Sequence, residues 1–406
     1  MKNDNKNIAY FFIVLSLLIT VILLLITLDD GYTFWNSPVE YDVTGQIGDF
    51  IGGVVGTIIS AAGFYFLYLT FNEQRSSFEK ERLESKFFDL VKLHRDNVNE
   101  LRFDGKELVE NYDSLFIDKT IYEGKSVFKV IFNQFVICKN ELGPFFRRDK
   151  IYLPDYEKEL LNDIYIIENK INLTTLAKVD ICYSIVFYGV SSEGLLILEN
   201  LFSQKYKPKF INDILRFISL KPAYDKDILE KWAVLSNRKT RGKRTEIVTQ
   251  IYDWRKTKKL DDDFQFAETI RDYHNRYIKY YGGHQFRLGH YFRHLYQTVK
   301  FINNHDNIDY QTKYEYVKIL RSQLSTYEQA ILFTNSLSQM GKSWELQPKI
   351  NSQLKKYKKY DFELITKYNL IKNLPGESIY GFPFKEFFRD IEYENDNVRK
   401  ERKNYH

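Results

Sequence analysis

Residues 8–28, IAYFFIVLSLLITVILLLITL, and residues 47–71, IGDFIGGVVGTIISAAGFYFLYLTF, decide how this chain is organised. The first stretch carries no charged residue, and the second carries only Asp49. A helix needs about 20 mostly apolar residues to cross the hydrocarbon core of a bilayer. We therefore predict two transmembrane helices, one over each stretch.

The charges around these stretches predict their orientation. The loop between them, residues 29–46, is acidic and contains no Lys or Arg. The basic residues lie outside the pair, at Lys2, Lys6, Arg75, Lys80 and Arg82. Positive flanks stay in the cytoplasm, so we expect a two-pass membrane hairpin with both termini in the cytosol. A cleaved signal peptide is the alternative for the first stretch, but its apolar run is too long and no small-residue cleavage site follows it.

The rest of the chain has the composition of a folded helical protein. Of its 406 residues, 17% are aromatic and only 8 are proline. Few helix breakers and long apolar runs at three- and four-residue spacing favour an all-α fold. The net charge of +5 suits anionic lipid or RNA as a neighbour but requires neither. The two cysteines, Cys138 and Cys182, form no CxxC pattern and fit a reducing cytosol.

Three regions follow from these patterns. We predict a transmembrane hairpin over residues 1–71, a juxtamembrane helix and linker over 72–125, and a cytosolic α-helical domain over 126–406. His94 falls on the apolar face of the juxtamembrane helix, and we interpret it as a satisfied core histidine. Residues 102–125 look irregular. In the cytosolic domain we predict helices over 126–141, 155–171, 173–202, 208–219 and 226–235, and two signature helices within 286–340, the second over 313–340.

The second apolar stretch contains a row of small residues. Gly48, Gly52, Gly56 and Ser60 follow one another at four-residue spacing, so they share one face of a helix. Small residues allow helices to approach closely in lipid. The row therefore predicts helix packing, either against the first helix of the same chain, which we favour, or between several copies of the hairpin.

The most basic segment is RKTRGKR, residues 238–244, inside a loop that we predict at 236–260. Its basic side chains are candidates for binding the phosphate groups of nucleic acid or lipid. These candidates are Arg238, Lys239, Arg241, Lys243 and Arg244. No aromatic residues alternate with them to stack bases, so we favour a solvated surface loop near the membrane over a nucleic-acid site.

Five of the seven histidines lie close together in the C-terminal half of the sequence. One interpretation is a metal pair, His290 and His294, with His284 or Glu268 as a third ligand, although no HExxH motif or Cys pair is present. A second is an Arg-x6-His pair, Arg287 and His294, similar to that of HEPN-type ribonucleases, in which the histidine moves a proton and the arginine holds the phosphate. A third, which we favour, is structural: these residues join helices or form a partner-binding face.

Two blocks of the sequence resemble a known family. GDFIGGVVGTIIS, LTFNEQRSSFE and SKFFDLVKLH look like the membrane-to-cytosol junction of the putative phage abortive-infection (AbiC-like) proteins. GHYFRHLYQTVKFI and YEYVKILRSQLSTYEQAILFTNSLS look like the C-terminal signature of the same family. The signature positions are Gly289, Tyr291, Phe292, Arg293, Leu295, Tyr296, Arg321, Gln323, Leu324 and Ser325.

The resemblance implies a bacterial anti-phage protein whose host cell stops growing or dies before phage is released. It supplies no catalytic mechanism and no catalytic residue. We expect a membrane-anchored, non-enzymatic defence protein with a cytosolic sensor and effector body, which responds to a phage or host component and uses no cofactor or metal. The alternatives are a ribonuclease effector that uses Arg287 and His294, and a membrane-perturbing homo-oligomer that assembles through the glycine row.

Overall fold

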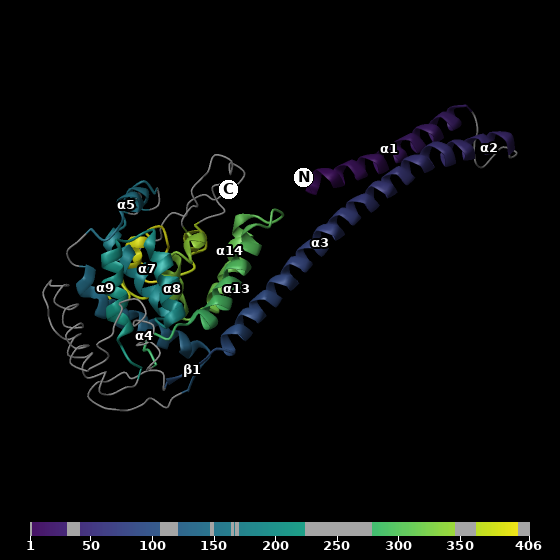
Figure 1. Cartoon of the computed structure of the whole chain (residues 1–406). Coiled ribbons are helices and arrows are strands. Elements are labelled where there is room, and N and C mark those ends of the chain that lie inside the picture. The colour runs from purple at the N-terminus through teal and green to yellow at the C-terminus, as the bar shows by residue number, and fades with distance from the viewer. Residues whose placement is uncertain are drawn as a thin grey trace, which may run out of the picture. The chain divides into compact units, whose positions relative to one another are not determined.

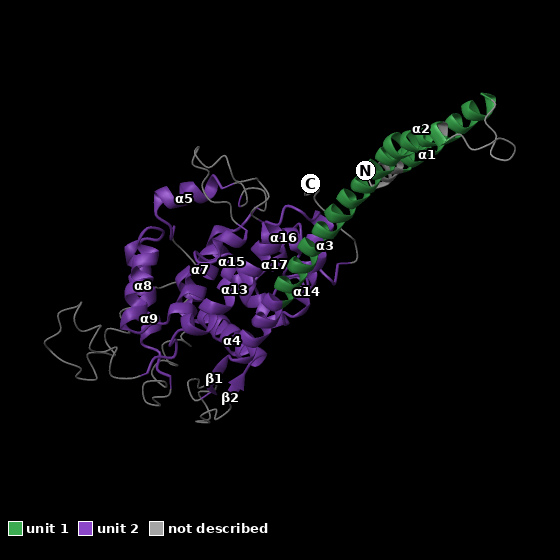
Figure 2. Cartoon of the chain, turned by 90° about the vertical axis from the view of Figure 1, so that its right-hand side faces the viewer, with its two compact units in different colours: residues 1–88 green, residues 89–406 purple. Residues whose placement is uncertain are grey.

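The computed structural model describes residues 2–30, 41–105, 121–146, 150–163, 166, 170–223, 278–345 and 363–396. Figure 1 traces the elements in chain order, and Figure 2 divides the chain into two compact units, Met1–Phe88 and Asp89–His406. The described residues are predominantly helical, with one two-stranded sheet. The predicted predominance of helix is therefore confirmed, whereas the arrangement of a membrane hairpin and a cytosolic domain stays a prediction.

Unit 1 consists of long apolar helices. Its elements are α1 (Lys2–Asp29), α2 (Tyr41–Phe50), the π-helical turn η1 (Ile51–Val55) and most of α3 (Gly56–Asn99). Helix α1 contacts η1 and lies alongside this part of the chain in both views. Two helical stretches, Tyr10–Asp29 and Thr44–Asn99, are long and apolar enough to cross a membrane, judged by length and composition. The side of the membrane on which each end lies stays a prediction.

The glycine row has open space beside two of its members. A Cβ atom added at Gly48 or Gly52 would meet no heavy atom within 4 Å. The buried residues of this part of unit 1 include Val55 and Ala62, which are not members of the row. Packing of the row against the first helix, which we favoured, and packing between copies of the hairpin both stay predictions.

Unit 2 begins with the last turns of α3 and a short antiparallel sheet of β1 (Arg102–Asp104) and β2 (Ile121–Glu123). Its other described elements are helical. They are α4 (Lys125–Leu142), η3 (Gly143–Phe146), α5 (Pro154–Leu161), α7 (Leu173–Tyr188), α8 (Ser192–Ser203), α9 (Pro208–Ser219), α13 (Gln285–Asn303), α14 (Tyr310–Ser322), α15 (Thr326–Ser336), η4 (Lys342–Trp344), α16 (Leu364–Tyr368) and α17 (Phe384–Phe387).

Helix α7 lies in the core of unit 2. Apart from Lys178, every residue from Leu176 to Phe187 is buried, as expected for a helix that is apolar on nearly all sides. The side chain of Asn172 caps its N-terminus by accepting a hydrogen bond from the backbone of Thr175. Helices α4 and α15 pack against α7 and against each other. Together these three helices support α13, which carries the first half of the sequence signature.

Several predicted helices are divided in the structure. The helix expected over 173–202 is two helices, because Gly189 adopts φ +76° and ends α7. The helix expected over 313–340 is also two, because Ser325 forms a capping box that starts α15. The helix expected over 155–171 ends at Leu161 as α5, and part of the segment thought irregular forms β1 and β2. The predicted helix 226–235, the basic loop 236–260 and the candidate ligand Glu268 lie outside the described residues.

Candidate functional site

The two opposite faces of α13 carry different kinds of signature residue. Arg287, Tyr291 and His294 recur at steps of four and three residues and share one face. Arg293 and Tyr296 lie on the opposite face with Gly289. The first face joins α13 to buried polar groups of unit 2, and the second forms part of a pocket.

The pocket is open and has a volume of about 730 Å³. It lies between the end of α7, the start of α8, the first turns of α13 and η4, and aromatic rings form much of its wall. The rings belong to Phe187, Tyr188, Phe286, Phe292, Tyr296 and Trp344. The ring of Tyr296 meets that of Trp344 edge to face, with centroids 5.1 Å apart, which fixes both side chains in the wall.

Three titratable or charged side chains of the pocket, His290, Arg293 and Glu193, are exposed. The side chains of His290 and Arg293 are exposed, and among the described residues no hydrogen bond or ion pair engages them. Glu193, at the start of α8, contributes a carboxylate to the same wall. Gly282 and Gly283 form the edge where the chain approaches the end of α7. An apolar pocket with a few convergent polar groups is the usual form of a small-molecule site.

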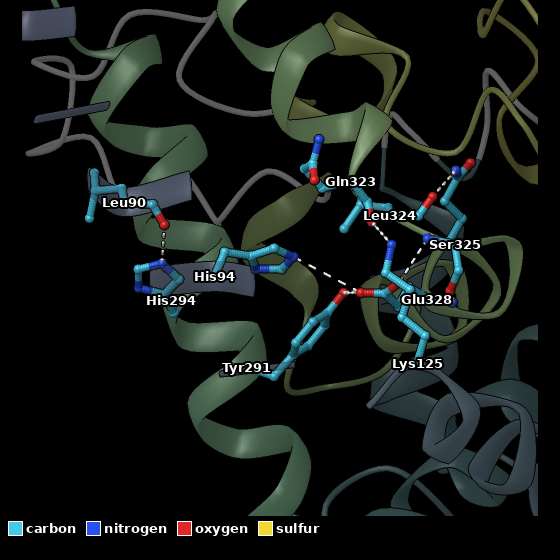
Figure 3. Close-up of polar contacts among 10 residues, drawn as sticks. Leu90, His94, Lys125, Tyr291, His294, Gln323, Leu324, Ser325 and Glu328 are labelled. Atoms are coloured by element: carbon cyan, nitrogen blue, oxygen red, sulfur yellow. Dashed lines mark hydrogen bonds and ion pairs between the residues drawn. The ribbon is translucent and has the colours of Figure 1, made fainter. Parts of the chain in front are cut away.

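The other face of α13 meets a buried polar cluster, which we call the His94 cluster (Figure 3). It contains His94 from α3, Tyr291 and His294 from α13, and Glu328 from α15. The hydroxyl of Tyr291 donates to Oε1 of Glu328 at 3.1 Å, and Nε2 of His94 lies 4.0 Å from that same oxygen. The other carboxylate oxygen, Oε2, accepts the backbone N–H of Ser325 at 2.7 Å.

Burial determines the charge states in the His94 cluster. Desolvation, followed by the nearby charges of His294 and Lys125, lowers the pKa of His94 to about 4, so its imidazole is neutral at pH 7. Desolvation also raises the pKa of Glu328, although hydrogen bonds from Ser325 oppose the shift. Both side chains are at most 1% exposed. No substrate can reach them in this conformation, so the cluster is suited to holding helices together and not to surface chemistry.

A second buried group surrounds the start of α13. NH1 of Arg287 lies 3.1 Å from Nδ1 of His284, and Nε2 of His284 lies 2.6 Å from Oε1 of Gln134. Because arginine can only donate, Nδ1 accepts and Nε2 carries the proton that is donated to Gln134. Burial and the charge of Arg287 lower the pKa of His284 to about 3. His284 is therefore a neutral, fully engaged structural residue.

The two residues of the Arg-x6-His pair make structural contacts in the fold. Nε of Arg287 donates to the carbonyl oxygen of Arg102 at 2.9 Å. Nε2 of His294 donates to the carbonyl oxygen of Leu90 at 2.9 Å. Two side chains seven residues apart on α13 thus bind two main-chain acceptors of one continuous segment, which runs from the end of α3 into β1. A catalytic role for the pair stays a prediction.

The metal interpretation finds no support in the described part of the chain. His290 faces the pocket, His294 is bonded to Leu90, and His284 is enclosed by Arg287 and Gln134. Among the residues that the structure describes, no group of three or more His, Cys, Asp or Glu side chains is placed to hold a metal ion.

The second half of the signature stabilises the region around α14 and α15. Arg321 is buried, and its guanidinium donates to the carbonyl oxygens of Tyr368 and Asn369. The carbonyl of Gln323 accepts a hydrogen bond from Nζ of Lys125 at 2.7 Å. Leu324 is buried, as is Leu295 in α13, and Ser325 caps α15.

Sequence reasoning missed two features of this region. His94 is buried as predicted, but neither of its ring nitrogens has a hydrogen-bond partner in the described structure, so the prediction of a satisfied histidine was wrong. The pocket was also missed, since its walls come from α7, α8, α13 and η4. The sequence offered one signal, the adjacent glycines Gly282 and Gly283. Their contact with Gly189 becomes visible only in the folded chain.

Comparison with known proteins gives a family match for the region that contains α13 to α16. Residues 283–379 match the model of a family described as putative phage abortive infection protein. The match includes every signature position and one wall of the pocket, and it confirms the resemblance drawn from the sequence. No curated protein and no solved structure matches the chain.

Proposed function

We propose that this chain is a membrane-anchored anti-phage protein that acts by abortive infection, with unit 2 as its sensor and effector body. The observation that carries the proposal is the family match over residues 283–379, which contains the whole C-terminal signature. The two apolar helices that precede unit 2 support attachment to a membrane. Attachment to the inner membrane would place unit 2 where it can meet phage products made in the cytosol.

A binding role for unit 2 agrees best with its contacts. Arg287 and His294 donate to main-chain carbonyls, and the His94 cluster is closed to solvent. The exposed signature residue Arg293 lies instead on the wall of an open pocket. We therefore favour a protein that senses a component through this face and then interferes with the cell or the phage.

The first test is phage challenge of cells that carry the full chain. Abortive infection predicts that a culture survives when phage are few and collapses when phage exceed cells, because infected cells are lost before they release progeny. Arg293→Ala should lose protection at unchanged protein abundance, since the side chain is exposed. Arg95→Ala, an exposed arginine of α3 outside the pocket, is the matched control and should protect like the wild type. Survival of infected cells under excess phage would contradict an abortive mechanism.

The ribonuclease alternative predicts a different result. If Arg287 and His294 were catalytic, the double substitution Arg287→Ala with His294→Ala would leave abundance unchanged and abolish RNA cleavage after infection. We expect instead that the double variant loses stability, because two part-buried hydrogen bonds to main-chain carbonyls are lost, at about 0.5–1.5 kcal/mol each. RNA integrity and a thermal melt, measured on the same variant, distinguish the two.

A further inference from the structure

We propose that the pocket between α7, α8, α13 and η4 binds a nucleotide, with the base between aromatic rings and the phosphate at Arg293. This inference rests on the proposed function and names the kind of component that unit 2 would sense. It is carried by the size of the pocket, the chemistry of its walls and an arginine that the described residues leave without a partner.

The size of the pocket fits a ligand of this class. Its volume of about 730 Å³ lies within the range of roughly 300–1,000 Å³ that is usual for small-molecule and cofactor sites. The pocket is open to solvent, so a ligand can enter without unfolding any element. A mononucleotide would fill it, whereas a phosphate ion alone would leave the aromatic walls unused.

The aromatic wall favours a flat ring system. Phe286 is 69% exposed at the start of α13 and lines the pocket, and the guanidinium of Arg287 lies over its ring, 4.3 Å from the ring centre. Tyr188 and Tyr296 also line the pocket, and the buried Trp344 supports Tyr296 from behind. Any of the nucleobases can stack on such rings, because every base has a π face.

The charged groups select an anionic ligand that also carries hydrogen-bond donors. Arg293 is exposed and unpaired among the described residues, and a guanidinium suits a phosphate because its N–H groups match the oxygens in pairs. His290 lies three residues before Arg293 on α13, so the two side chains are neighbours on the same side of the helix. The carboxylate of Glu193 accepts hydrogen bonds, so it suits the hydroxyl groups of a ribose or the amino group of a base.

Gly289 provides a way to block the pocket without disturbing the fold. It lies within α13, lines the pocket, and has no heavy atom within 4 Å of the position that a Cβ would take. A larger side chain there would extend into the pocket. Gly289→Leu should therefore fold as well as the wild type and exclude the ligand.

The experiment is titration of the purified full chain, in detergent, with AMP, GMP, CMP and UMP. We expect at least one of them to bind with a Kd below about 1 mM. Arg293→Gln should weaken that binding about tenfold, as expected for loss of a charge-assisted phosphate contact. Gly289→Leu should abolish it at an unchanged melting temperature. Arg95→Gln is the matched control and should bind like the wild type. Adenosine and inorganic phosphate, titrated alone, should each bind more weakly than the nucleotide.

Failure of all four nucleotides to bind would overturn the inference, as would binding that Gly289→Leu leaves intact. Phosphate binding as tightly as a nucleotide would also overturn it, because the aromatic wall would then contribute nothing. Phage challenge of the wild type tests the proposed function separately. Nucleotide binding without protection would refute the abortive function alone, and protection without nucleotide binding would refute only the ligand.

Discussion

His94 is 1% exposed, yet in the described structure neither of its ring nitrogens has a hydrogen-bond partner. A buried polar atom without a partner costs about 1–3 kcal/mol, so this side chain reduces the stability of unit 2. Oε1 of Glu328 lies 4.0 Å from Nε2 of His94 and already accepts from Tyr291. Natural proteins keep such costs mainly where a residue serves function, and His94 joins α3 to the signature helices α13 and α15.

The first prediction is that His94→Leu stabilises the protein. An apolar side chain of similar size removes the unpartnered nitrogens, and the free energy of unfolding at pH 7 should rise by about 1–2 kcal/mol. The pKa of His94 is about 4 in the folded state and about 6.5 when unfolded, so the wild type loses stability as the pH falls from 6.5 towards 4. The His94→Leu variant has no imidazole at this position, so it should not show this loss of stability between pH 6.5 and pH 4.

Thermal melts of both proteins at pH 7 and pH 5 check this prediction. His290→Leu, which changes an exposed histidine of α13, is the control. Its melting temperature should equal that of the wild type at both pH 7 and pH 5. A lower melting temperature for His94→Leu at pH 7 would show that the imidazole makes a stabilising contact after all. A stabilised variant that no longer protects cells would show that His94 is kept for function.

At the scale of elements, the break between α7 and α8 shapes the pocket. Gly189 has φ +76° and Gly283 has φ +91°, and the two backbones lie in direct contact. A Cβ at Gly189 would come within 2.6 Å of the carbonyl carbon of Gly282. Backbone atoms cannot move aside as a flexible side chain could, so only glycine fits. This close approach brings the start of α13 beside the start of α8.

The second prediction compares Gly189, at the break between α7 and α8, with Gly289, which lines the pocket. Gly189→Ala should destabilise unit 2 by about 2–4 kcal/mol, because it combines an unfavourable φ with a backbone clash. Gly289→Ala should instead stabilise it by about 0.5–1 kcal/mol, because alanine favours the interior of a helix and its Cβ meets free space. Urea unfolding of both variants gives the comparison. Equal effects would mean that the backbone contact is not maintained in solution.

The third prediction concerns the glycine row of unit 1. Gly48 and Gly52 are exposed and approach nothing within 4 Å, which leaves the row free to meet another copy of the chain. Gly52→Leu with Gly56→Leu should reduce crosslinking between copies in membranes by steric exclusion. Val54→Leu, on the same helix but off the row, is the control. Crosslinking that survives the double change would show that the copies meet elsewhere or not at all.

At the scale of the whole molecule, one helix belongs to both units. Helix α3 runs from Gly56 to Asn99 without interruption, so the second apolar stretch continues directly into the polar helix that enters unit 2. Residues 72–104 contain no Gly or Pro, so no helix breaker interrupts this part of the helix. Under the proposed membrane attachment, the side on which α3 would leave the membrane is the side on which unit 2 would act, so the orientation of the hairpin is decisive.

The fourth prediction tests that orientation. Both native cysteines, Cys138 and Cys182, are buried, so the folded chain offers a low background for thiol labelling. A cysteine in place of Ser37, in the acidic loop, should react with a membrane-impermeant maleimide applied to cells with a permeabilised outer barrier. A cysteine in place of Ser76 should react only after lysis. The reverse pattern would place unit 2 outside the cytoplasm and exclude the proposed function.

The sequence predicted helices whose residues are neighbours along the chain, but it did not predict contacts between segments that are far apart in the chain. The helices α4 and α9 lie within a residue of the predicted bounds, and α13 begins one residue before the predicted start of the signature helices, because apolar spacing depends only on neighbours. The break at Gly189 was missed because an isolated glycine is tolerated in a helical pattern, and its backbone contact comes from Gly282 and Gly283, far along the chain. The pocket could not be foreseen for the same reason.

The spacing of Arg287 and His294 correctly placed them on one face of a helix, but not their partners. Both partners are main-chain carbonyls, at Arg102 and Leu90. Every residue of a protein has such a carbonyl, so no pattern of side chains could have indicated which ones are used. The catalytic and structural interpretations therefore look the same in the sequence and differ only in the fold.

The same two carbonyls have an evolutionary consequence. An acceptor on the main chain is not lost when its side chain changes, so positions 90 and 102 can drift while the contacts persist. Among homologues, Arg287 and His294 should be retained without any correlated change at those two positions. Covariation, which detects contacts through paired substitutions, should therefore fail to find the two hydrogen bonds that join α13 to the end of α3 and to β1.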